Sequence, residues 1–91
     1  MTGSRRFAVE YDPKAVKELK KLDKPIARRV ARAIAELADD PRPQGARPLT
    51  GFPELWRLRV GDYRVVYTIR NAELLVLALR IAHGSTVYRD L

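Results

Sequence analysis

Several side chains in the second half of this sequence belong to types that can act on a phosphate group. Arg57 and Arg59 are separated by one residue, Arg64 follows closely, and His83 and Tyr88 lie near the end. Guanidinium groups bind phosphate oxygens through paired hydrogen bonds, and histidine is the side chain that most readily exchanges protons near neutral pH. When RNA is cleaved by its own 2′-hydroxyl, the protein needs only to position the backbone, stabilise charge and move protons. These residue types therefore indicate metal-free RNA cleavage.

Each of these residues also has a simpler interpretation. The three arginines can be solvated charges spread along a sheet edge, and a lone histidine at a strand end is more often structural or merely exposed. Tyr88 can stack on a base or donate a proton, but it can equally cover the edge of a sheet. Like charges on neighbouring strands repel one another, so an arginine cluster there favours an anion-binding site.

Other kinds of chemistry find little support. The chain has no cysteine, so it offers neither a disulfide nor a thiolate, and no His/Cys spacing fits a metal. Gly45 and Gly51 do not form a phosphate-binding fingerprint. We identify no Ser-His-Asp catalytic triad in the sequence. We therefore expect no metal and no cofactor.

The charge distribution favours a nucleic-acid partner. The net charge is +7, every lysine lies between Lys14 and Lys24, and every cation from Arg28 onward is arginine. Arginine binds phosphate bidentately and stacks on bases, whereas lysine acts as a point charge. Ordinary solubility charge and arginine-rich codon usage are the alternatives. We expect the catalytic residues to be Arg57, Arg64, His83 and Tyr88. Four further basic side chains should contact RNA, namely Arg59, Arg80, Lys20 and Lys21.

The first half of the chain predicts one strand and two helices. Residues 7–11 alternate between apolar and polar types, as in a short strand. Asp12 and Pro13 are typical of a helix start, and a second helix begins after 23–25 and ends before 39–51. We expect 39–51 to be a loop, because it contains three prolines and two glycines. Almost nothing joins the two helices, so they should form an antiparallel hairpin.

The second half predicts three further strands joined by tight turns. They comprise residues 56–60, 63–69 and 74–81, and short turns make them an antiparallel meander. We expect His83 to follow the last of these strands. The predicted fold is α+β with the order β-α-α-β-β-β: a two-helix hairpin packs on one face of a small, mostly antiparallel four-stranded sheet. The other face, which holds the arginines, should be open. We expect a single domain spanning 1–91.

The chain shows no membrane or export signal. No apolar run follows the basic residues at the start, and the longest apolar stretch, 74–79, is far too short to cross a bilayer. We expect a cytoplasmic protein with no membrane partner.

Several short motifs follow one another along the chain: YDPKA at 11–15, LKKL at 19–22, DPRP at 40–43, PLTG at 48–51 and LWRLRVGDYRVVY at 55–67, followed by His83 and the Val-Tyr pair at 87–88. Their order resembles the RelE branch of the RelE/ParE toxin superfamily, and the likeness covers Phe7 to Arg89. The motif with Gly61-Asp62 at its centre is the most specific.

The resemblance implies a RelE-like fold and a toxin of a toxin–antitoxin pair that enters the ribosomal A site and cleaves translated mRNA. It implies a cognate antitoxin that wraps the toxin, and an operator DNA that is read mainly by the antitoxin. Arg57 and Arg59 match two basic positions of the family, and Arg64 matches the arginine that holds the scissile phosphate. Tyr88 matches a tyrosine that stacks on a base or aids proton transfer, and His83 matches a histidine frequent in this branch.

One departure from the family pattern affects the predicted activity. Relatives usually carry one or two arginines where this chain has Gly84, Ser85 and Thr86. Arg80 is the nearest substitute, and its strand parity directs it to the open face. Two alternatives to a nuclease therefore remain, a ParE-like inhibitor of DNA gyrase and a degenerate binding module retained for its antitoxin and operator.

Overall fold

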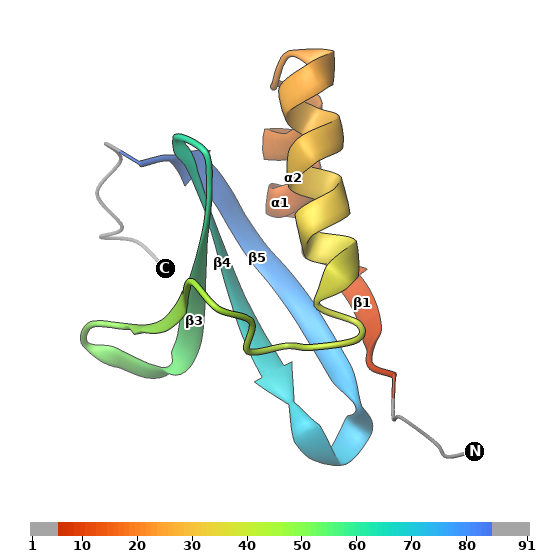
Figure 1. Ribbon diagram of the computed structural model, residues 1–91, viewed down its shortest axis with the longest axis vertical. Coiled ribbons are helices and arrows are strands. Elements are labelled where there is room, and N and C mark those ends of the chain that lie inside the picture. Colours follow the sequence, from red (N-terminus) through yellow and green to blue (C-terminus); the bar gives the residue numbers. More distant parts are fainter. Residues whose placement is uncertain (1–5, 85–91) are drawn as a thin grey trace.

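The structure, a computed structural model, describes residues 6–84. Its elements are β1 (Ala8–Tyr11), α1 (Pro13–Lys20), α2 (Lys24–Glu36), β2 (Ala46–Leu49), β3 (Phe52–Val60), β4 (Tyr63–Arg70), a 3-10 turn (Asn71–Glu73) and β5 (Leu75–His83). They form one sheet with the strand order β1-β5-β4-β3-β2, in which β1 runs parallel to β5 and all other neighbours are antiparallel. Figure 1 shows both helices on the same side of this twisted sheet.

The predicted α+β class and helical hairpin are confirmed, but the predicted strand number is wrong. The sheet has five strands, because Ala46–Leu49 within the expected loop pairs with β3 as an edge strand. Proline removes a backbone donor and is tolerated mainly at a sheet edge, where Pro48 lies. The last strand is also longer than expected, so His83 belongs to β5 rather than following it.

Both predicted helices are present, but α2 begins at Lys24, inside the 23–25 segment after which the sequence predicts its start. The carboxylate of Asp12 accepts a hydrogen bond from the backbone N–H of Lys14 at 2.9 Å and so caps α1, with Pro13 as its first residue. Pro25 occupies the same early position in α2. Proline suits the first turn because the N–H that it lacks would be unpaired there. Among residues 6–84, no helix is long and apolar enough to cross a membrane.

The core lies between the helices and one face of the sheet. Tyr67 is its largest fully buried side chain, and its hydroxyl donates a hydrogen bond to the carbonyl of Pro41 at 2.7 Å. This bond fastens the start of the long α2–β2 connection to the centre of the sheet. The other buried apolar residues of this cluster are Ala15, Val30, Ile34, Leu37, Leu58, Val60, Val65, Val76, Ala78 and Ile81.

Candidate phosphate-binding site

The β3–β4 hairpin places three arginines on one face of the sheet. Its turn begins at Gly61, whose φ of +59° suits the first position of a tight hairpin turn. The strand register sets Arg59 directly opposite Arg64, and Arg57 lies two residues further along β3. Residues opposite each other in an antiparallel pair share a face. Leu58 and Val65 alternate with these arginines and are buried against the helices, so the arginines occupy the other face.

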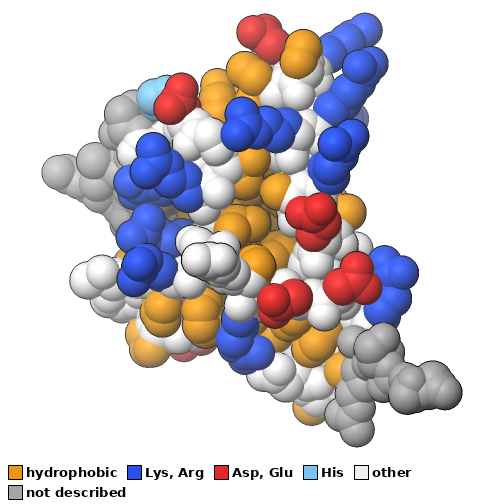
Figure 2. Space-filling view, viewed as in Figure 1, with side chains coloured by type: hydrophobic (Ala, Val, Ile, Leu, Met, Phe, Trp, Pro, Cys, Tyr) orange, Lys and Arg blue, Asp and Glu red, His pale blue; other side chains and the backbone are white. Residues whose placement is uncertain are grey.

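The positive charge of this cluster has no carboxylate partner in the part of the chain that the structure describes. None of Arg57, Arg59 and Arg64 forms an ion pair there. The one hydrogen bond of their guanidinium groups joins Arg59 Nε to the Gly61 carbonyl at 3.1 Å. Arginines held close together without a counter-charge leave their remaining donors available for an anion. Figure 2 shows a group of basic side chains on the left of the view, beside the pale blue histidine.

Two neighbouring clefts share Arg64. The first, the tip cleft, has a volume of about 240 Å³ and is lined by Arg59, Gly61, Asp62, Tyr63, Arg64, His83 and Gly84. The second, the side cleft, has a volume of about 290 Å³ and is lined by Leu49, Thr50, Phe52, Arg57 and Arg64. Arg64 therefore lies at the centre of the site, with one further arginine in each cleft. Asp62, Tyr63 and Phe52 were not predicted as site residues from the sequence.

His83 reaches the tip cleft from its rim. The register pairs His83 with Tyr63 at the end of the sheet, on the side opposite Arg64. The two rings meet edge to face, with 5.4 Å between their centroids and an interplanar angle of 81°. The imidazole is exposed and lines the same cleft as Arg59 and Arg64. It can therefore exchange protons with a group bound in that cleft.

Gly84 has a structural role that the sequence did not indicate. Its N–H donates a hydrogen bond to the carbonyl oxygen of Asp62 at 2.6 Å. A Cβ at this position would lie 3.0 Å from the same oxygen and 3.7 Å from Arg64 Nε. A side chain at residue 84 would require the Asp62 carbonyl to move by a few tenths of an ångström, so glycine suits the close approach of β5 to the β3–β4 turn.

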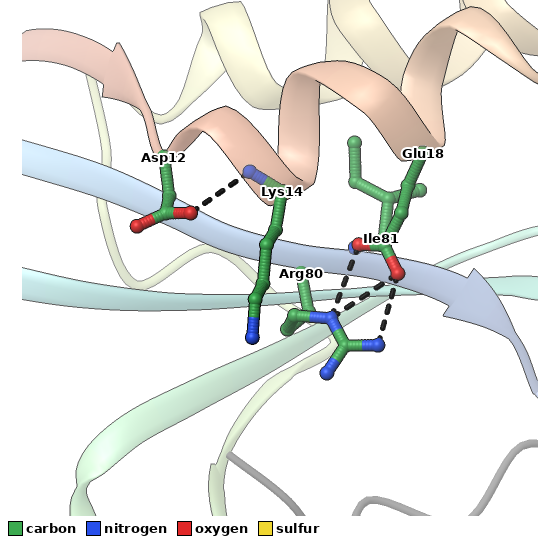
Figure 3. A network of polar contacts seen from close by, with 5 residues as sticks. All are labelled: Asp12, Lys14, Glu18, Arg80 and Ile81. Carbon is green, nitrogen blue, oxygen red and sulfur yellow. Dashed lines mark hydrogen bonds and ion pairs between the residues drawn. The ribbon is translucent and has the colours of Figure 1, made fainter.

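Arg80 is engaged with a carboxylate of α1 (Figure 3). Its Nε lies 3.2 and 3.1 Å from the two carboxylate oxygens of Glu18, and its second terminal nitrogen lies 3.0 Å from Oε2. Glu18 Oε1 also accepts a hydrogen bond from the backbone N–H of Ile81 at 2.8 Å. The partner strand β1 ends opposite Ala78, so Glu18 satisfies an N–H of β5 beyond the reach of β1. RNA contact by Arg80 stays a prediction.

The other predicted site residues lie apart from the arginine cluster or outside the described part of the chain. Lys20 is the last residue of α1, and Lys21 follows it; both are exposed. Lys21 lines a shallow hollow on α1 together with Arg80. Tyr88 lies outside the described residues. Within residues 6–84, no group of His, Cys, Asp and Glu side chains could hold a metal ion.

Comparison with known proteins assigns this chain to a family. The model of the family described as the ParE toxin of the type II toxin–antitoxin system, parDE, matches residues 9–88. The mRNA interferase toxin RelE of Escherichia coli (strain K12) is 26% identical over 88 residues, which are 92% of this chain and 92% of that protein.

Solved structures agree with this assignment. The archaeal RelE–RelB complex from Pyrococcus horikoshii OT3 superposes with a TM-score of 0.78 at 26% identity, over 90% of this chain and 99% of that one. The toxin–antitoxin complex RelBE2 from Mycobacterium tuberculosis gives 0.79 at 25% identity, over 94% and 100%.

The fold and the family match together define a toxin of the type II toxin–antitoxin class. The chain belongs to the RelE/ParE toxin superfamily and is of the RelE type. The matched family model is named for ParE and the relatives for RelE, so the mode of action has to be argued from the residues of the site.

Proposed function

We propose that this protein is an mRNA endonuclease that cleaves translated mRNA at the arginine cluster. The observation that carries the proposal is the position of Arg64, which lines two adjoining clefts with Arg57 in one and Arg59 in the other. A strand of RNA laid across the two clefts would meet an arginine at each of three successive points. Of the relatives, the Escherichia coli RelE toxin is named an mRNA interferase.

In the proposed reaction the nucleophile belongs to the substrate. Arg64 binds the oxygens of the scissile phosphate, while Arg57 and Arg59 bind the backbone on either side. The 2′-hydroxyl oxygen attacks phosphorus and the bond from phosphorus to the 5′-oxygen breaks, which leaves a 2′,3′-cyclic phosphate and a 5′-hydroxyl. The guanidinium groups stabilise the extra negative charge of the phosphorane, and removing one such donor typically costs 10²–10³-fold in rate.

Two protons move in this reaction, one from the 2′-hydroxyl and one to the leaving 5′-oxygen. Arginine holds its proton too tightly to act as a general base. His83 lines the cleft shared by Arg59 and Arg64, and we assign it one of the two transfers. Tyr88 is our candidate for stacking on a base or for the second transfer, by its match to the family position.

We further propose that a cognate antitoxin binds this protein. The Pyrococcus horikoshii and Mycobacterium tuberculosis relatives were solved as complexes with antitoxin. The ribosome is the proposed site of action, and operator DNA would be read mainly through the antitoxin. Neutralisation of toxicity by the product of the neighbouring gene, and co-purification with it, test this partner; a failure of both would contradict it.

The test of the nuclease is cleavage of an mRNA in a purified translation system, with and without ribosomes. We expect cuts inside translated codons, and a loss of at least about 100-fold for Arg64→Ala. Arg70→Ala is the matched control, because Arg70 lies on the same strand but at its far end and pairs with Glu73 at 3.6 Å. It should cleave like the wild type.

Absence of cleavage by a folded wild-type protein would contradict the proposal. A supercoiling assay would then separate the two alternatives. Inhibition of DNA gyrase would establish a ParE-like toxin, and no inhibition would leave a binding module retained for antitoxin and operator.

A further inference from the structure

A third and larger hollow adjoins the side cleft. It has a volume of about 480 Å³, within the range of small-molecule sites. Its apolar walls come from Phe52 and Leu55 of β3 and Leu79 of β5. The polar residues around it are Asp12, Lys14, Glu54 and Arg80.

This hollow, which we call the base pocket, lies between two basic regions. At one end Phe52 also lines the side cleft, together with Arg57 and Arg64. At the other end Lys14 and Arg80 also line the shallow hollow on α1 that contains further lysines. Figure 3 shows the side chains of Lys14 and Arg80 directed to the same side of β5. An RNA strand held by Arg64 and drawn towards the lysines of α1 would therefore pass over the base pocket.

We propose that the base pocket binds the nucleobase of a nucleotide next to those held by the arginine cluster, and so sets sequence preference. This inference rests on the proposed function. Leu55 in its wall pairs with Thr68, four residues along β4 from Arg64, or roughly 14 Å at the usual strand rise. The base in the pocket therefore belongs to a different nucleotide from the one whose phosphate Arg64 binds.

Phe52 supplies the surface on which the base stacks. An aromatic ring stacks on every base, and loss of one such contact usually weakens binding of a single strand about 5- to 100-fold. Phe52 is half-buried and lines both the side cleft and the base pocket, so its ring lies where the strand passes from one to the other. This contact should act on all four bases alike.

Glu54 supplies the selectivity. The hydroxyl of Thr68 donates a hydrogen bond to the backbone carbonyl of Glu54 at 3.1 Å and fixes the chain there. The Glu54 carboxylate forms no ion pair with another described residue. The other carboxylate of the pocket, that of Asp12, already accepts a hydrogen bond from the backbone N–H of Lys14. A carboxylate accepts hydrogen bonds from the exocyclic amino groups of adenine, cytosine and guanine. Uracil has no amino group, and its one donor on that edge, N3–H, lies between two carbonyl oxygens, which a carboxylate repels.

The first experiment measures cleavage rates on ribosomes programmed with synthetic mRNAs that carry each of the four bases at each position around the cut. For the wild type we expect one position at which uracil lowers the rate about tenfold. Glu54→Gln should reduce that difference to about threefold or less, since the glutamine amide can also donate a hydrogen bond to uracil. Glu36→Gln, an exposed carboxylate on α2, is the matched control and should keep the wild-type preference.

Phe52 variants test the stacking surface separately. Phe52→Ala should slow cleavage of all substrates about 5- to 100-fold, and Phe52→Tyr should restore most of the rate. The base pocket would be overturned if the wild type had no base preference, or if Glu54→Gln left that preference unchanged. It would also be overturned if Phe52→Ala cleaved like the wild type. Each of these outcomes would leave the nuclease itself intact.

A binding measurement keeps the inference testable if no cleavage is seen. Six-residue oligonucleotides with 2′-deoxyribose sugars lack the attacking hydroxyl and so cannot be cleaved by this route. Each one carries 2-aminopurine at a different position, and stacking of this base lowers its fluorescence. We expect quenching at one position with the wild type and its loss with Phe52→Ala. No quenching at any position would overturn the base pocket.

Discussion

Glu18→Ala is the substitution with the largest effect on stability that the structure predicts outside the apolar core. The Glu18 carboxylate accepts hydrogen bonds from three donors, Arg80 Nε, the second terminal nitrogen of Arg80, and the N–H of Ile81. The side chains of Arg80 and Glu18 are only 25% and 24% exposed. Truncation would therefore remove the Glu18 acceptor both from a largely buried cation and from a backbone donor.

The expected cost follows from these contacts. A buried donor that loses its acceptor costs about 1–3 kcal/mol, and breaking a fully buried ion pair costs roughly 3–5 kcal/mol. Because water still reaches a quarter of this pair, we expect a loss of about 3 kcal/mol in the free energy of unfolding. For a domain of this size, that corresponds to a fall of about 12–24 °C in Tm. Glu18→Gln keeps one acceptor oxygen but replaces the other with an NH2 group and removes the charge, so it should lose less, about 2 kcal/mol.

The assay is urea unfolding of Glu18→Gln, Arg80→Gln and the double variant, read as a double-mutant cycle. We expect a coupling free energy of about 1–2 kcal/mol, with Glu36→Ala as an exposed control within about 0.5 kcal/mol of the wild type. A coupling free energy below about 0.3 kcal/mol would contradict this prediction, because ion pairs exposed on a protein surface have coupling energies that small.

Three further predictions follow from single contacts. Burial raises the pKa of Tyr67 to about 12, so the folded state keeps the phenol proton where the unfolded chain loses it. The resulting stability is complete below pH 10 and is lost as the pH rises towards 12; Tyr67→Phe should flatten this fall, and unchanged urea midpoints across that range in the wild type would contradict it. Gly84→Ala should cost roughly 1–2 kcal/mol, because the new Cβ lies 3.0 Å from the Asp62 carbonyl oxygen; an unchanged Tm would show that the turn can yield. Arg57→Ala should reduce the slope of log affinity for single-stranded RNA against log salt concentration by about 0.7, whereas an unchanged slope would mean that Arg57 makes no phosphate contact.

Much of the fold could be predicted from the sequence because local signals agree with the tertiary structure. The Asp12 cap and the early prolines Pro13 and Pro25 mark the helix starts, and the alternation along β3 and β4 fixes which side chains share a face. The β3–β4 turn sets the register, so the shared face of the three arginines follows from spacing alone. Ala46–Leu49 could not be recognised, because a four-residue edge strand that contains proline lacks a strand signal.

Features that depend on contacts between distant elements could not be predicted. The sheet face predicted for Arg80 was correct. Arg80 pairs with Val66, which pairs in turn with Arg57, so Arg80 and Arg57 lie on the same face of the sheet. Its partner Glu18 lies 62 residues away in the sequence, and only the packing of α1 along β5 brings the two together. The role of Gly84 likewise depends on the close approach of the Asp62 carbonyl.

We propose that the arginine cluster promotes attack by the 2′-hydroxyl of the RNA itself. This attack is tested by cleavage, on ribosomes, of an mRNA in which a single 2′-deoxyribose replaces the ribose on the 5′ side of the cut. We expect the wild-type protein to cut the all-ribose mRNA, leaving a 2′,3′-cyclic phosphate, and not to cut at the deoxy position. Cleavage at an unchanged rate at that position would contradict the proposal, because the nucleophile would then have to come from elsewhere.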